Sequence, residues 1–148
     1  MVTQYSTSTS VADLTDGAEY RFKVAAENAV GDGAISDGVA IYAATVPNAP
    51  AAPTMVSQSG TSITIQWTDN GSSDTGGSPV FDYRIYWDNA AGDGVFTELA
   101  ETTAPDFTFT TGDVEAGYNY RFKITAINIV GESLKSPEVA IIASSLPG

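Results

Sequence analysis

The densest group of oxygen-bearing side chains in this chain lies at residues 69–77, in the stretch DNGSSDTGG. Carboxylates, amides and hydroxyls such as those of Asp69, Asn70 and Asp74 are the ligands that Ca²⁺ takes in proteins. The stretch lacks the regularly alternating acids and the closing glutamate of an EF-hand loop. We therefore interpret it as a turn between two strands, with calcium binding as the alternative.

Asn70 also begins the single N-x-Ser/Thr sequon of the chain, Asn70-Gly71-Ser72. On an exposed loop of a secreted eukaryotic protein such an asparagine accepts an N-linked glycan. Such triplets also arise by chance in serine-rich loops. The sequence thus leaves both readings of Asn70 open, and the glycosylated one would make this a glycoprotein.

Residue types for catalysis are sparse. The chain has no cysteine and no histidine, which removes thiolate chemistry, the commonest general base and the commonest transition-metal ligand. Two acid pairs have the residue types of a glycosidase, Asp82 with Asp88 and Asp113 with Glu115. They fall at expected strand ends and turns, so we interpret them as solvated acids. We predict no enzymatic activity, no cofactor and no metal.

The charge balance excludes further partners. Six basic residues stand against eighteen acidic ones, for a formal net charge of −12. Nucleic acids and anionic membrane surfaces need clusters of Lys and Arg, so neither is an expected partner. No apolar run approaches the roughly 20 residues that cross a bilayer, which argues against direct membrane insertion. Residues 2–6 do not resemble a signal peptide, so we expect a mature portion or a fragment of a longer polypeptide.

Three segments alternate apolar and polar residues with a period of two, at 62–67, 81–88 and 118–126. This pattern is typical of half-buried strands, and turn-forming residues separate the segments. The sequence therefore predicts an all-β, antiparallel β-sandwich. Its predicted core contains the inward-facing residues Trp67, Tyr83, Ile85, Tyr120, Phe122 and Ile124, with Tyr20 and Phe22 in an earlier segment.

Arg84 and Tyr86 lie on the opposite, outward face of the segment at 81–88. An exposed aromatic residue beside an arginine is a frequent anchor of protein interfaces. Single exposed aromatic residues are also routine. We treat Arg84 and Tyr86 as a possible interaction surface.

The chain repeats itself after one hundred residues. YRFKVAAENAVGDG begins at Tyr20 and YRFKITAINIVGES begins at Tyr120, and residues 1–48 align without a gap on 101–148 with 17 of the 48 positions identical. A fixed period of this size indicates a tandem array of similar modules.

The second period resembles a fibronectin type III domain. The resemblance rests on Pro53, Trp67, GGSPVFDYRIYW at 76–87, VEAGYNY at 114–120 and YRFKITAINIVGESLKS at 120–136. It implies an immunoglobulin-like sandwich of seven strands in which the hydroxyl groups of Tyr120 and Tyr20 bond to nearby backbone. In the first period it implies three strands, called E, F and G in the family, at 3–14, 19–28 and 37–44.

The resemblance therefore divides the chain into three parts. Residues 1–46 form the C-terminal half of one domain, 47–52 a proline-rich linker, and 53–148 a complete domain with the start of the next linker. Three strands with one bare apolar face are not expected to be stable alone. Each copy of the chain carries one front half and two rear halves, so identical copies cannot complete each other. We expect a segment of a longer tandem polypeptide.

The expected function is that of a non-enzymatic structural or adhesive module of an extracellular, cell-surface or filament-forming polypeptide, which acts as a mechanical spacer. Its expected partners are neighbouring fibronectin type III repeats, other protein chains in a fibre or at a cell surface, or glycans. The alternatives are an accessory spacer or binding domain of a secreted carbohydrate-active enzyme or cell-surface receptor, and an intracellular scaffold.

Overall fold

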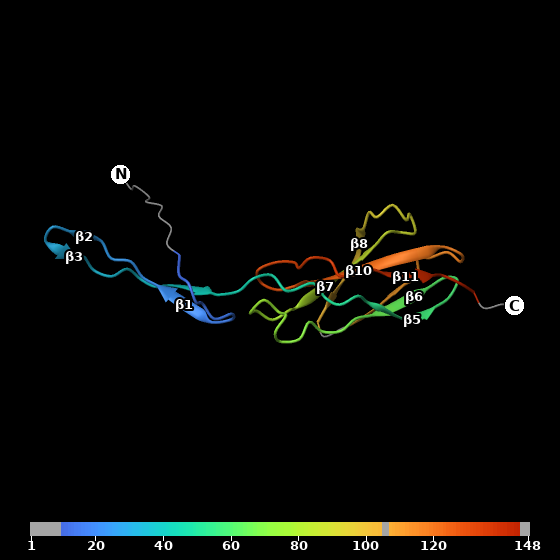
Figure 1. The fold of residues 1–148 in the computed structure, drawn as a ribbon, viewed down its shortest axis with the longest axis horizontal. Coiled ribbons are helices and arrows are strands. Elements are labelled where there is room, and N and C mark those ends of the chain that lie inside the picture. The colour runs from blue at the N-terminus through green and yellow to red at the C-terminus, as the bar shows by residue number, and fades with distance from the viewer. Residues whose placement is uncertain (1–9, 105–106, 146–148) are drawn as a thin grey trace. The chain divides into compact units, whose positions relative to one another are not determined.

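The computed structural model describes residues 10–104 and 107–145, and within these ranges every regular element is a β-strand (Figure 1). The contacts between residues divide the chain into two compact units, Met1–Ala43 and Ala44–Gly148. We call them unit 1 and unit 2. Within unit 2, residues 44–100 are named the front half and residues 101–143 the rear half.

The described residues of unit 2 form two antiparallel sheets. Strands β5 (Thr54–Gln58), β6 (Ile63–Gln66) and β9 (Thr108–Thr111) form the three-stranded sheet in the order β5-β6-β9. The four-stranded sheet has the order β11-β10-β7-β8, and its strands are β7 (Asp82–Trp87), β8 (Thr97–Thr103), β10 (Asn119–Ile127) and β11 (Val139–Ile142). The front half thus supplies β5, β6, β7 and most of β8, and the rear half supplies β9, β10 and β11.

The core of unit 2 lies between these sheets because each strand turns alternate residues inward. Ile63 and Ile65 of β6 belong to the same buried cluster as Ile85 of β7 and Ile124 of β10. Trp67, Tyr83, Tyr120 and Phe122 are buried in it as well. The pairing of Ile124 with Ile85 and of Phe122 with Trp87 fixes which face of β10 points inward.

Aromatic rings run through this core in tilted and stacked pairs. The ring centroids of Trp67 and Tyr83 lie 5.7 Å apart, and Phe107 meets Tyr83 edge-on at the same distance. Trp87 stacks on Tyr120, also at 5.7 Å. These separations lie within the favourable range for aromatic pairs, so the rings join the front half to the rear half.

The two tyrosines at the corner before the long rear strand behave as the resemblance implies. The hydroxyl oxygen of Tyr120 accepts a hydrogen bond of 2.9 Å from the backbone N–H of Glu115. The hydroxyl oxygen of Tyr20 accepts the equivalent bond, also 2.9 Å long, from the N–H of Thr15. The prediction for both corners is confirmed.

In residues 10–43, the described part of unit 1, the strands form two small antiparallel pairs. Strand β1 (Glu19–Phe22) pairs with β4 (Val39–Tyr42), and β2 (Glu27–Asn28) pairs with β3 (Gly31–Asp32). The partners Tyr20 and Ile41 in β1 and β4 correspond to Tyr120 and Ile141 in β10 and β11, and the whole register repeats at an offset of one hundred residues. Unit 1 therefore has the backbone pairing of the rear half of unit 2.

Two expected strands of unit 1 differ from the sequence prediction. The strand expected at 19–28 ends at Phe22, whereas β10 of unit 2 continues to Ile127. The reason is pairing, since residues 122–127 of β10 pair with β7 and no described strand of unit 1 takes that place. The strand expected at 3–14 lies outside the described residues as far as residue 9, and residues 10–14 are not in a strand.

The buried position of Trp67 gives a stability prediction for unit 2. Trp67→Ala should lower the free energy of unfolding by about 3–5 kcal/mol, because it removes a large side chain from a packed core and leaves a cavity. Urea unfolding followed by circular dichroism measures this loss. Met55→Ala on the exposed side of β5 is the control and should change the stability by no more than about 0.5 kcal/mol. Equal stability of the two variants would contradict the core assignment.

Candidate functional site

The segment that precedes β5 is bound to the loops of unit 2. The N–H of Thr45 donates to the carbonyl oxygen of Gly76 at 2.8 Å, and the N–H of Asn48 donates to the carbonyl oxygen of Asp74 at 2.9 Å. We call residues 44–48 the linker segment, residues 68–79 the β6–β7 loop and residues 128–133 the β10–β11 turn. The linker segment thus forms part of the folded unit that follows it.

Asn128 connects the linker segment to both loops. Its Oδ1 accepts hydrogen bonds from the N–H groups of Val130 and Gly131 at 2.9 and 3.2 Å, which shapes the β10–β11 turn. Its Nδ2 donates to the carbonyl oxygens of Thr45 and Thr75 at 2.7 and 2.8 Å. Because Asn128 is buried, these four bonds satisfy an amide that would be costly to leave unpaired.

Asn70 holds the other side of the same segment. Its Nδ2 donates to the carbonyl oxygen of Asn48 at 2.7 Å, and Asn48 in turn donates from its own Nδ2 to Asp74 Oδ1 at 2.8 Å. Asn70 is buried in this arrangement. An N-linked glycan is attached through Nδ2, so this loop conformation does not present the predicted glycosylation residue to solvent. The sequon alone could not predict this contact, because the partner Asn48 lies 22 residues away in the sequence.

Gly76 makes the close approach of the linker segment possible. Its φ is +72°, and a Cβ atom added there would lie 2.4 Å from the carbonyl oxygen of Thr45 and 2.6 Å from that of Val46. Neither the backbone conformation nor the space suits a residue with a side chain. The glycine in this loop therefore serves the linker contact as well as the turn.

The acids of the β6–β7 loop are engaged in hydrogen bonds. Asp69 Oδ1 accepts the hydroxyl of Tyr83 at 3.1 Å. Burial and this carboxylate together raise the pKa of Tyr83 to about 12. Asp74 accepts from Asn48 as described above, and the described residues contain no cluster of three or more acidic side chains placed to hold a metal ion.

The opposite end of unit 2 has its own fastening, formed by Gln58 and Ser144. Gln58 Nε2 donates to Ser144 Oγ at 2.8 Å, and the N–H of Ser144 donates back to Gln58 Oε1 at 2.8 Å. Gln58 ends β5 and Ser144 follows β11, so these bonds join the edges of the two sheets. Sequence reasoning did not identify this pair, which is 86 residues apart.

The predicted interaction residues Arg84 and Tyr86 share one partner, Glu132. Glu132 accepts hydrogen bonds from Arg84 Nη1 at 2.9 Å, from the Tyr86 hydroxyl at 2.5 Å and from Thr125 Oγ1 at 2.6 Å. The ammonium group of Lys135 lies 4.1 Å from the centre of the Tyr86 ring. Both predicted residues thus belong to a polar network on the outer face of β7 and β10.

The network also sets the ionisation of Glu132. Partial burial alone raises the pKa of this carboxyl, but the hydrogen bonds from Thr125 and Tyr86 and the charge of Arg84 outweigh burial. The pKa of Glu132 therefore lies below its ordinary value.

The prediction that Asp88 is a solvated acid is wrong, because this residue is buried at the end of β7. Its carboxylate is buried and accepts hydrogen bonds from the backbone N–H and the Nη1 of Arg121, at 3.0 and 2.9 Å. Burial raises the pKa of Asp88, but the bonds from Arg121 and from the N–H groups of Ala90 and Gly92 hold it below the ordinary value. These contacts fasten the end of β7 to β10.

The described residues contain no helix long and apolar enough to cross a membrane. The family model described as "Fibronectin type III domain" matches residues 48–142. Myomesin-2 from Homo sapiens is 34% identical over 130 residues, which cover 82% of this chain and 8% of that protein. A Xenopus laevis protein named "Cell adhesion molecule-related/down-regulated by oncogenes" is 32% identical over 92 residues, covering 62% of this chain and 7% of that protein. The chain thus spans less than a tenth of the length of either relative.

Solved structures show the same fold. A crystal structure of several titin domains superposes with a TM-score of 0.63 at 22% identity and covers 75% of this chain and 37% of the titin chain. The crystal structure of the FN1–FN3 domains of chicken CNTN1 superposes with a TM-score of 0.58 at 21% identity, covering 89% of this chain and 44% of that one.

The role of Asn128 is tested by Asn128→Asp, which keeps Oδ1 and replaces the donor Nδ2 by an acceptor. Loss of the two bonds to Thr45 and Thr75 should release the linker segment, and the amide hydrogens of Thr45 and Asn48 should exchange roughly tenfold faster or more. Hydrogen exchange followed by NMR measures both amides. Asn28→Asp at the equivalent position of unit 1 is the matched control and should leave them unchanged. Unchanged exchange in Asn128→Asp would refute the fastening.

The Glu132 network gives a pH-dependent prediction. The stabilising contribution of a carboxyl with a lowered pKa is present above its ordinary value, 4.5 here, and is lost as the pH falls through the lower folded value. The native chain should therefore lose about 1 kcal/mol more stability between pH 7 and pH 3 than Glu132→Gln does. Urea unfolding at both pH values measures the difference. The exposed Glu115→Gln should behave like the native chain, and an identical loss in Glu132→Gln would count against the network.

Proposed function

This chain belongs to the fibronectin type III family, and from that premise we propose that it is a load-bearing spacer of a longer polypeptide built from tandem domains of this family. In this role the module is non-enzymatic. It transmits tension from one neighbour to the next, with the sandwich of unit 2 as the element that resists extension. The single observation that carries the proposal is the fastening of both ends of unit 2, at the linker segment and at Ser144.

The entry point of the load is supported by the contacts of the linker segment. Tension from the N-terminal side reaches unit 2 through Thr45 and Asn48, whose backbone is bonded to Gly76 and Asp74 and to the side chains of Asn70 and Asn128. A free linker would deliver the load directly to β5. The bound segment spreads it over two loops first.

The exit point lies at the other end of the strands. Strand β11 runs antiparallel to β10 and ends beside Asn119, the first residue of β10, whereas Asn128 follows the last. The load therefore runs along β5 and β11, across the direction of their ladder hydrogen bonds. Several ladder bonds must break together in this geometry, and the bonds between Gln58 and Ser144 add to them.

The relatives support a structural or adhesive setting. One is named as related to a cell adhesion molecule, and each matches this chain over less than a tenth of its own length, which is the relation expected between one module and a long array. We accordingly place the module outside the cell or at its surface, with neighbouring repeats as its first partners. Contacts with other chains or with glycans would use the outer face that carries Arg84 and Tyr86.

Single-molecule force spectroscopy of the full chain, held between handles at its two ends, tests the proposal. Unit 2 should unfold in one event that lengthens the chain by about 300 Å, the difference between roughly 100 extended residues and a folded domain. Gln58→Ala should unfold roughly fivefold faster at the same load, since the three hydrogen bonds between Gln58 and Ser144 are lost.

Gln66→Ala is the matched control, because Gln66 is an exposed glutamine on the neighbouring strand β6. It should unfold at the native rate. Extension of the native chain without a discrete event would contradict a load-bearing role. Equal unfolding rates for Gln58→Ala and Gln66→Ala would show that the bonds between Gln58 and Ser144 do not resist the load, and that only the linker end does.

A further inference from the structure

Unit 1 exposes an apolar face. Tyr42 and Ala43 line a shallow hollow of about 200 Å³ on β1, β4 and the segment before them, together with five further residues, Val11, Leu14, Tyr20, Phe22 and Ile41. We call these five residues the bare face. Water-exposed apolar side chains grouped in this way mark a surface that another segment covers.

The equivalent residues of unit 2 show what such a cover does. Ile41 is 53% exposed and Leu14 is 42% exposed, whereas Ile141 and Val114 are 5% and 6% exposed. The neighbouring residue Tyr42 differs in this respect, since it is 62% exposed and its equivalent Ile142 is 58% exposed. The two units therefore differ in exposure on the face of β4 that carries Ile41, and not on the face that carries Tyr42.

The backbone excludes a different local fold as the cause. Strands β1 and β4 have the register of β10 and β11, and the N–H of Val24 bonds to Ser36 Oγ at 2.9 Å just as the N–H of Ile124 bonds to Ser136 Oγ. Yet Val24 is 73% exposed and Ile124 fully buried. In unit 2 the front half makes the difference, because β6 and β7 cover and pair with the rear half there.

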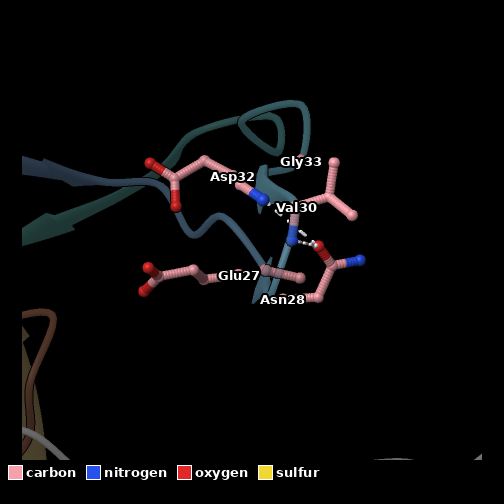
Figure 2. Close-up of a pocket in the computed structure, with 7 residues that line it drawn as sticks. Glu27, Asn28, Val30, Asp32 and Gly33 are labelled. Carbon is pink, nitrogen blue, oxygen red and sulfur yellow. Dashed lines mark hydrogen bonds between the residues drawn. The ribbon is translucent and has the colours of Figure 1, made fainter.

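The turn at Asn28 gives a second, polar indication (Figure 2). Asn28 Oδ1 accepts the N–H groups of Val30 and Gly31 at 2.9 and 3.3 Å, as Asn128 Oδ1 does in unit 2. Figure 2 shows its Nδ2 pointing away from the turn, and no described residue accepts a hydrogen bond from it. The hollow beside it measures about 360 Å³. At Asn128 the same nitrogen holds two backbone carbonyls of the front half.

We infer that the bare face and the Asn28 turn form one binding surface for a polypeptide segment with the chemistry of residues 44–100, which precedes unit 1 in the same polypeptide. That segment supplies an apolar strand in the place of β6, a pairing strand in the place of β7, and two carbonyls for Asn28. This inference rests on the tandem arrangement proposed above. It identifies the partner of unit 1 as a front half that lies before it in the same polypeptide.

The choice of this occupant over a second copy of the chain follows from stoichiometry. Each copy has one front half, and that half is already closed on its own rear half in unit 2. Exchange between identical copies therefore leaves one rear half per chain uncovered. A front half placed ahead of unit 1 repeats the order that unit 2 already shows.

The test is a graft onto the full chain. A second copy of residues 44–100 is placed directly before Met1, which preserves the offset of one hundred residues between equivalent positions. Hydrogen exchange is followed at the amides of Ser36 and Ala43, which bond to the carbonyls of Val24 and Ala18, and at the equivalent amides of Ser136 and Ala143 in unit 2.

In the native chain the unit 1 amides should exchange at least about 100-fold faster than their equivalents. In the grafted chain they should slow by a similar factor. A graft carrying Ile63→Ser, Ile65→Ser and Trp67→Ser in the added copy is the length-matched control and should give no slowing. Slow exchange of Ser36 and Ala43 in the native chain, or no slowing in the graft, overturns the inference.

Matched variants on one strand make the result specific. Within the graft, Ile41→Asp should abolish the slowing, whereas Tyr42→Asp, on the side of β4 that stays exposed in both units, should retain it within about threefold. Asn28→Asp should speed exchange at the added Thr45 and Asn48 roughly tenfold and leave Ala43 slow. Equal effects of the charge at 41 and 42 would contradict the assigned face.

The remaining alternative has its own measurement. If protection of Ser36 and Ala43 in the native chain rises when the protein is concentrated tenfold, a second copy covers the face and the inference is wrong. Independence of concentration supports it. Failure of the graft would leave the forced unfolding of unit 2 unaffected, so the two proposals fail separately.

Discussion

The structure depends on the burial of one apolar face of β10 against the three-stranded sheet. Ile124 and Phe122 of β10 are fully buried in one cluster with Ile65 of β6 and the aromatic residues of the core. A two-stranded pair cannot shield such residues on both sides, and hydrophobic burial is the main favourable contribution to folding. The same rear-half sequence pattern therefore gives two outcomes in one chain: a closed sandwich where a front half is present, and two short antiparallel strand pairs where none is described.

The polar contacts have a different role, which is to set boundaries. Asn128 and Asn70 hold the linker segment on the loops, and Gln58 with Ser144 joins the sheet edges at the far end. Each such bond contributes only about 1 kcal/mol, far less than the core. Their value lies in position, since they determine where a folded unit begins and ends, and hence where tension from a neighbour is applied.

The period of two was enough to predict which residues of unit 2 face inward, because alternation along a strand is a local property. Tyr20 and Phe22 of unit 1, also predicted as core residues, are only half-buried. Trp67, Tyr83 and Phe122 are buried in the structure, and the corner bonds of Tyr20 and Tyr120 followed from the family resemblance. The contacts of Asn70, Asn128 and Glu132 could not be predicted in this way. Besides their near neighbours, these residues bond to partners that lie 22, 83 and 48 residues away, and only the closed fold brings these together. The repeated Asn-x-x-Gly at 28–31 and 128–131 was the one available signal.

The central claim is that Ile41 is exposed in unit 1 and the equivalent Ile141 is buried in unit 2 because only unit 2 has a second sheet that covers this face. The most direct measurement is the relaxation of the Ile41 and Ile141 methyl groups by a soluble paramagnetic probe, recorded in the same native chain by NMR. The account predicts strong relaxation of the Ile41 methyls and little relaxation of those of Ile141. Equal protection of the two isoleucines would contradict it.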